Sequence, residues 1–130
     1  MLVPLIRSSW TPEKQRVIKD GMGPLAAKRN EPLKSKNDIR DLGSGEKLWL
    51  YSHGSTSEFA GKGAEELAKW LMSPQIRMPK GPREVILKGC ATAGFATSVQ
   101  EYLNARTGYE QVVVVGFDGE ASMTTTTTCS

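Results

Sequence analysis

The chain has 130 residues, enough for one domain with a single hydrophobic core. Hydrophobic residues make up 38% of it and charged residues 24%, which is typical of a globular protein. No apolar run reaches the roughly 18 residues that a transmembrane helix needs. The apolar run at the amino terminus is too short and too interrupted for a signal peptide. We therefore expect one domain without a membrane span, either cytoplasmic or exported without a cleaved signal, including delivery to a host cell.

The charged residues and cysteines argue against nucleic-acid binding, a disulfide framework and a zinc site. The net charge of +3 is spread along the chain, without the blocks of basic residues or the arginine–aromatic alternation of nucleic-acid binders. Cys90 and Cys129 are too few for a disulfide framework. Together with a single histidine they also offer too few ligands for zinc, so we expect no metal site.

Residues 1–45 carry the weaker structural signals. The segment 2–6 predicts a short strand whose proline suits the edge of a sheet. A threonine followed by proline at 11–12 is typical of a helix start, and we expect glycine and proline at 21–24 to interrupt that helix. The polar segment 30–45 predicts a loop.

From residue 46 onward the chain alternates strands and helices. The expected elements are strand 47–52, helix 64–71, strand 84–88, helix 95–103 and strand 111–117. The last strand is apolar on both faces, which predicts a central or well-covered position. The alternation predicts a single α/β domain with its core at 46–120 and a mainly parallel sheet. The threonine-rich residues 121–130 fit either an added strand or a tail.

The only histidine, His53, and the only interior cysteine, Cys90, each directly follow an apolar strand. Ligands and chemistry collect beyond the carboxyl ends of parallel strands, because those ends meet at one edge of the sheet. The two side chains can serve there as general base and nucleophile. The backbone amides of Gly54 and Cys90 would form the oxyanion hole. The helix that follows Cys90 would stabilise its thiolate.

These segments resemble a known family. A strand followed by His53-Gly54, and a strand followed by Gly89-Cys90, are similar to the caspase-like cysteine peptidases, which include caspases, legumains, clostripain and gingipains. The segments 50–55, 59–67 and 86–96 look most like the autoprocessing cysteine protease domain of large bacterial toxins. The resemblance implies a caspase-like three-layer sandwich with a His53–Cys90 dyad.

The resemblance also implies a substrate and an activator. Toxin domains of this kind cleave after leucine, in a peptide or protein that includes their own chain, and are switched on by inositol hexakisphosphate in a basic pocket. The expected anion-binding residues here are Lys62, Lys80, Arg83 and Lys88. An orienting carboxylate for the histidine has three nominees, Asp38, Asp41 and Glu46.

Two other functions stay open at this point. A caspase-like module without catalysis would serve as a binding or assembly domain. A hydrolase using Ser52 or Ser55 is a third option, although neither serine lies in the Gly-x-Ser-x-Gly motif of a nucleophile elbow.

Overall fold

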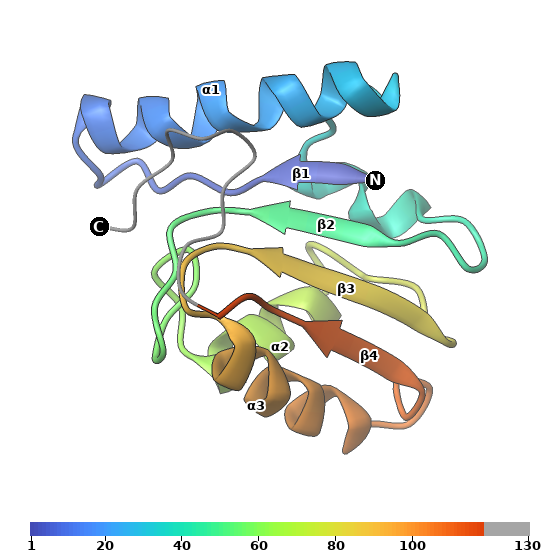
Figure 1. Ribbon diagram of the computed structural model, residues 1–130. Coiled ribbons are helices and arrows are strands. Elements are labelled where there is room, and N and C mark those ends of the chain that lie inside the picture. The colour runs from blue at the N-terminus through green and yellow to red at the C-terminus, as the bar shows by residue number, and fades with distance from the viewer. Residues whose placement is uncertain (119–130) are drawn as a thin grey trace.

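A computed structural model describes residues 1–118 and shows a four-stranded sheet with helices on both faces (Figure 1). The strands are β1 (Leu2–Pro4), β2 (Leu48–Tyr51), β3 (Arg83–Lys88) and β4 (Val112–Val115). The helices are α1 (Pro12–Arg29), the 3-10 helix η1 (Lys36–Asp41), α2 (Ala64–Met72) and α3 (Ala93–Asn104). The threonine-rich segment 121–130, expected as strand or tail, lies outside the described residues.

The sheet has the strand order β1-β2-β3-β4, and every neighbouring pair is parallel. This confirms the predicted α/β architecture and the parallel pairing of the two strands that precede His53 and Cys90. Helix α1 lies on one side of the sheet, while α2 and α3 lie side by side on the other (Figure 1). Three layers result, with all four strands ending at one edge.

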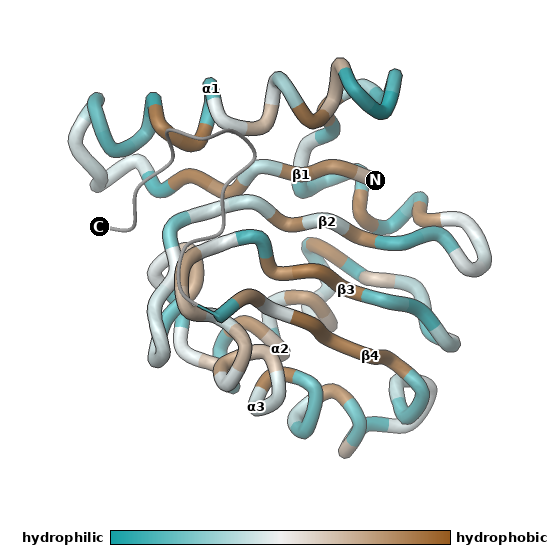
Figure 2. The backbone as a smooth tube through the Cα atoms, in the orientation of Figure 1, coloured by the Kyte–Doolittle hydropathy of each residue, from teal (hydrophilic) through white to brown (hydrophobic). Residues whose placement is uncertain are grey.

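The larger core lies between the sheet and helices α2 and α3. Alternate strand residues such as Leu50 and Leu87 meet Leu67 of α2 and Val99 of α3, and all four are fully buried. Hydrophobic residues are accordingly concentrated in the strands, with hydrophilic residues in the connections (Figure 2). Burial of these side chains is the main force that holds the two strand ends in fixed positions.

Helix α1 is continuous, so the predicted interruption at 21–24 is wrong. Thr11 caps the helix by accepting a hydrogen bond from the Lys14 amide at 3.2 Å, as expected from the Thr-Pro start. Pro24 lies inside the helix and removes one backbone hydrogen bond. The helix continues because Ile18 and Met22 are buried against the sheet, and tertiary packing outweighs local propensity.

Gly21 gives a sharp test of that packing. A Cβ there would lie 2.3 Å from the Tyr51 hydroxyl and within 2.8 Å of two ring atoms of this buried side chain. We expect Gly21→Ala to destabilise the fold by about 1–3 kcal/mol, although alanine favours helix. Gly23→Ala is the matched control, because its Cβ would meet nothing within 4 Å and should add stability. Urea unfolding measures both, and equal stabilisation by the two variants would contradict the packing of Tyr51 beneath α1.

Strand β4 differs from expectation, because it lies at an edge of the described sheet rather than in a central position. Its outward-facing Val113 is 47% exposed. Two side chains of α3 bind the outer edge of β4: Gln100 Oε1 accepts from the Val114 amide at 2.8 Å, and Asn104 Nδ2 donates to the Val112 carbonyl at 3.0 Å. Helix α3 therefore satisfies backbone groups that a free edge strand leaves unpaired.

The amino-terminal third is more ordered than the sequence indicated. The segment expected as a loop at 30–45 contains η1, whose start is a capping box between Ser35 and Asp38. Strand β1 forms as predicted and occupies the other edge of the sheet. Its last residue is Pro4, where a missing N–H is tolerated.

Candidate functional site

The candidate site lies where β2 and β3 end together. The paired register runs to Tyr51 opposite Lys88, and the Ser52 amide extends the ladder by donating to the Lys88 carbonyl at 3.2 Å. His53 and Cys90 both begin the loops that leave this edge. The structure thus places the two predicted residues just after the carboxyl ends of neighbouring strands.

His53 is held in one orientation by helix α1. Its Nε2 lies 2.9 Å from the main-chain carbonyl oxygen of Lys14, in the first turn of the helix. Because a carbonyl oxygen can only accept, Nε2 carries the hydrogen. Trp10 meets the imidazole edge to face, with 5.0 Å between ring centroids. The ring is half-buried, and its own carbonyl accepts from the Ala60 amide at 2.9 Å.

The orienting partner of His53 is thus a main-chain carbonyl, while two of the nominated carboxylates are bonded elsewhere. Asp38 accepts from the Ser35 amide at 2.9 Å. Glu46 precedes β2, at the opposite end of that strand from His53. Asp41 is the last residue of η1. Sequence reasoning missed Lys14 because its contribution comes from the backbone, to which the residue type gives no clue.

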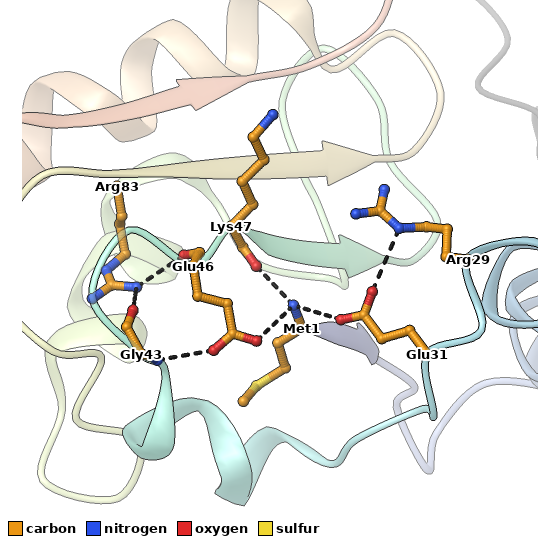
Figure 3. Close-up of polar contacts among 7 residues, drawn as sticks. All are labelled: Met1, Arg29, Glu31, Gly43, Glu46, Lys47 and Arg83. Carbon is orange, nitrogen blue, oxygen red and sulfur yellow. Dashed lines mark hydrogen bonds and ion pairs between the residues drawn. The ribbon is translucent and has the colours of Figure 1, made fainter.

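Glu46 belongs to a polar cluster at the amino ends of the strands (Figure 3). Its carboxylate accepts from the Gly43 amide at 2.9 Å and lies 3.3 Å from the Met1 ammonium nitrogen. That nitrogen also donates to the Lys47 carbonyl at 2.8 Å and pairs with Glu31 at 3.0 Å. The Gly43 hydrogen bond, helped by the ammonium group, holds the pKa of Glu46 below its usual value. The cluster ties β1 to the turn before β2.

The lowered pKa makes a prediction about acid stability. A carboxyl whose pKa is lower in the folded than in the unfolded state stabilises the fold above the unfolded pKa. That contribution is lost as the pH falls through the folded pKa, so the sensitive window lies below about pH 4.5, the ordinary pKa of a glutamate side chain. We expect the stability difference between the native chain and Glu46→Gln to be largest at neutral pH and to vanish in acid. Urea unfolding at several pH values measures it, and a constant difference would contradict the assignment.

Arg83, one of the expected anion-binding residues, lies at the same end of the sheet and binds backbone carbonyls there. Its Nη1 donates to the Glu46 carbonyl at 3.0 Å and is 3.4 Å from the Gly43 carbonyl (Figure 3). The side chain is buried, and this burial lowers the pKa of the guanidinium. Arg83 therefore fastens the turn before β2 to the start of β3.

The other three expected anion-binding residues lie in separate places. Lys62 lies 5.6 Å above the Trp70 ring, and Lys80 lines a surface hollow of about 630 Å³ with Gly81, Pro82 and Gly108. Lys88 lies 4.3 Å above the Phe117 ring, where burial lowers its pKa. The distance from Lys88 to Arg83, along the length of β3, is roughly 16 Å. The four cations do not converge on one pocket, and inositol hexakisphosphate as activator stays a prediction.

Cys90 is disulfide-bonded in the structure, whereas the expected role as a nucleophile requires a free thiol. The only other cysteine in the sequence, Cys129, lies outside the described residues. Cys90 is half-buried in a tight turn, where the Gly89 amide donates to the Leu87 carbonyl at 3.1 Å and Ala91 takes a left-handed φ of 54°. Any chemistry of the sulfur as a nucleophile thus requires reduction first.

The loops after β2 and β3 contact each other through Gly54. A Cβ on Gly54 would lie 2.6 Å from the Thr92 methyl and 3.3 Å from the Cys90 carbonyl oxygen. The absence of a side chain at Gly54 thus permits the close approach of the 90–92 loop. The oxyanion hole from the Gly54 and Cys90 amides stays a prediction.

A small hollow of about 120 Å³ opens beside His53. Gly54, Trp10, Lys14, Ser55, Glu58 and Gly61 line it together with the histidine. This volume equals that of about four water molecules, enough for one small substrate group. A small molecule in this hollow would lie beside the His53 side chain.

The two serines considered as nucleophiles have structural roles. Ser52 is buried, and its hydroxyl donates to the Leu5 carbonyl at 2.7 Å, which ties β2 to the segment after β1. Ser55 closes an exposed turn by accepting from the Ser57 and Glu58 amides at 3.2 and 3.1 Å. Neither arrangement activates a serine hydroxyl through a neighbouring base.

Comparison of this chain with protein-family models, curated proteins and solved structures finds no match. In residues 1–118, no helix is long and apolar enough to cross a membrane. The same part of the chain contains no group of three or more acidic, histidine or cysteine side chains that could hold a metal ion.

Proposed function

We propose that this chain is a caspase-like cysteine endopeptidase, or an autoprocessing protease domain of a bacterial toxin or effector, with His53 and Cys90 as its catalytic dyad. The observation that carries the proposal is the parallel pairing of β2 and β3 up to Tyr51 and Lys88. It brings a general base and a sulfur to adjacent strand ends, at the edge where parallel sheets hold their active sites. The three-layer arrangement of helices and sheet is compatible with this class.

The first step is attack by the Cys90 thiolate on the carbonyl carbon of the scissile peptide bond. Carbon and sulfur form a bond, and the carbonyl oxygen becomes an oxyanion facing the amides of Gly54 and Cys90. The C–N bond then breaks, and His53 gives its proton to the leaving amine. Water hydrolyses the resulting thioester and returns the sulfur to its starting form.

The contact between His53 and Lys14 fits this role. The carbonyl of Lys14 fixes the Nε2–H tautomer, so Nδ1 is the nitrogen that exchanges a proton with the thiol. The same carbonyl stabilises the imidazolium that forms when the thiol ionises, as the third member of a catalytic triad does. Helix α3 begins just after Cys90, and its positive end favours the thiolate.

Its substrate is a peptide or protein, with the chain's own polypeptide among the candidates. Reduction of the Cys90 disulfide precedes activity, which makes the peptidase dependent on a reducing environment. The cytoplasm, including that of a host cell into which the protein is delivered, provides such an environment. Export without a cleaved signal is compatible with this scheme.

A second candidate function is favoured by one observation, the disulfide at Cys90. If this bond is permanent, the sulfur has a structural role and the domain serves in binding or assembly. The two functions differ in whether reduction creates a reactive thiol.

Selective labelling of Cys90 distinguishes the two functions. Cys129→Ser leaves Cys90 as the only cysteine, so an acyloxymethyl ketone or iodoacetamide reports on one thiol. We expect rapid labelling at neutral pH, cleavage of casein or of a peptide with leucine before the scissile bond, and loss of both in the His53→Ala version. Labelling at the rate of an ordinary thiol, unchanged by His53→Ala and without cleavage, would favour the binding module.

A further inference from the structure

Thr92 connects the loops that follow three of the four strands. It is fully buried, two residues after Cys90 and directly before helix α3. Its hydroxyl oxygen lies 2.9 Å from the Leu87 carbonyl oxygen and 3.1 Å from the Gly89 carbonyl oxygen, and its single hydrogen is shared between these two acceptors. The same oxygen accepts from the Phe117 amide at 3.1 Å. One side chain thus binds the end of β3, the turn that contains Cys90 and the segment after β4.

Two glycines make room for this threonine. A Cβ on Gly54, in the loop after β2, would lie 2.6 Å from the Thr92 methyl. A Cβ on Gly116, after β4, would lie 2.3 Å from the Thr92 carbonyl oxygen and 2.7 Å from its hydroxyl oxygen. The loop of His53 and the loop of Cys90 therefore approach each other closely at Thr92, and the ring of Phe59 packs against Gly54 and Gly89 of the same two loops.

Thr92 lies at a helix start, where a threonine side chain usually forms a capping hydrogen bond. A threonine before the first turn of a helix usually caps it by accepting from a backbone amide of that turn. Thr92 is the N-cap residue of α3, yet its side chain makes no capping hydrogen bond. The hydroxyl is directed instead to the backbone of the Cys90 turn, so its role concerns the loop rather than the helix.

From this geometry we infer that Thr92 is the positioning residue of the site, which sets the place of Cys90 relative to His53. The inference rests on the proposed peptidase function. Removal of the hydroxyl takes one donor from the carbonyls of Leu87 and Gly89 and the acceptor from the Phe117 amide, which allows the Cys90 turn to shift. The sulfur then moves away from the imidazole that favours its ionisation.

The test compares Thr92→Val with Thr92→Ser in the reduced Cys129→Ser protein. Valine keeps the shape of threonine without its hydroxyl, whereas serine keeps the hydroxyl without the methyl. The measurement is the rate of alkylation of Cys90 by iodoacetamide as a function of pH, with the melting temperature of each variant. We expect Thr92→Val to slow alkylation at pH 7 by about tenfold and to move its midpoint toward that of an ordinary thiol. Thr92→Ser should stay within about twofold of the parent.

A positioning role requires that the midpoint of the pH profile of alkylation changes when the Thr92 hydroxyl is removed and stays the same when the hydroxyl is kept. Equal profiles for Thr92→Val and its parent, or equal losses in the valine and serine variants, would overturn the inference. If the valine variant does not fold, Thr92→Ala takes its place, because the smaller side chain leaves room for water to satisfy the two carbonyls.

His53→Ala separates this inference from the proposed function. If His53→Ala slows alkylation and Thr92→Val does not, the dyad is supported and the role of Thr92 is rejected. If Thr92→Val slows alkylation while the parent cleaves no peptide, Thr92 positions a reactive cysteine and the peptidase proposal fails.

Discussion

We expect Cys90→Ala to remove all measurable peptidase activity from the reduced protein, a loss of at least about 10⁴-fold in kcat/KM. In the proposed mechanism the sulfur of Cys90 forms the acyl intermediate, so its removal leaves no covalent route to cleavage. His53→Ala should cause a loss of similar size, because members of one catalytic unit do not contribute additively. Rates of cleavage of a leucine-containing peptide measure both losses.

Cys129→Ser is the control for this pair of variants. It removes the second cysteine and keeps the dyad, so it should retain the activity of the reduced native chain. Unfolding in urea under reducing conditions checks that the fold survives, since alanine at the end of a strand removes few packing contacts. Full cleavage by Cys90→Ala would point to a serine or a metal as the source of activity.

The sequence predicted that His53 and Cys90 follow neighbouring strands, because the strand and helix patterns around the two residues agree. Apolar strands followed by helices require parallel crossovers, and consecutive units of this kind become neighbours in the sheet. His53 and Cys90 therefore came together from the pattern alone. The surroundings of the two residues could not be predicted in the same way. The Lys14 carbonyl is a backbone group, and it contacts His53 only because α1 packs on the sheet.

Other differences arise from tertiary contacts that local signals do not contain. The glycines and proline of 21–24 favour a break, but burial of Met22 and the close packing of Gly21 on Tyr51 keep α1 continuous. The four valines of β4 indicated a central or well-covered strand, but β4 lies at an edge of the described sheet. There Gln100 and Asn104 of α3 form hydrogen bonds with backbone groups of β4 that no neighbouring strand pairs. The role of Thr92 was hidden because a threonine at that position normally indicates only a helix cap.

We expect Gly116→Ala to be the most destabilising single substitution considered. Its Cβ would lie 2.3 Å from the carbonyl oxygen and 2.4 Å from the carbonyl carbon of Thr92, which are backbone atoms that no rotamer change can move. The segment after β4 must therefore separate from the Cys90 turn. That separation stretches two hydrogen bonds, from the Phe117 amide to the Thr92 hydroxyl and from the Ala93 amide to the Phe117 carbonyl. Overpacking and two weakened hydrogen bonds together cost roughly 2–5 kcal/mol.

Gly94→Ala is the matched control, because this glycine lies in the first turn of α3 and its Cβ would meet nothing within 4 Å. Alanine there should raise stability by up to about 1 kcal/mol. Urea unfolding of the two variants in reducing buffer gives the comparison, and Gly116→Ala molecules that still fold should alkylate Cys90 more slowly than the parent. Similar stabilities for the two variants would mean that the chain after β4 does not rest on Thr92. The end of β4 would then be positioned independently of the Cys90 turn, and the loops of His53 and Cys90 would be connected through the contacts of Gly54 with Thr92 and Phe59.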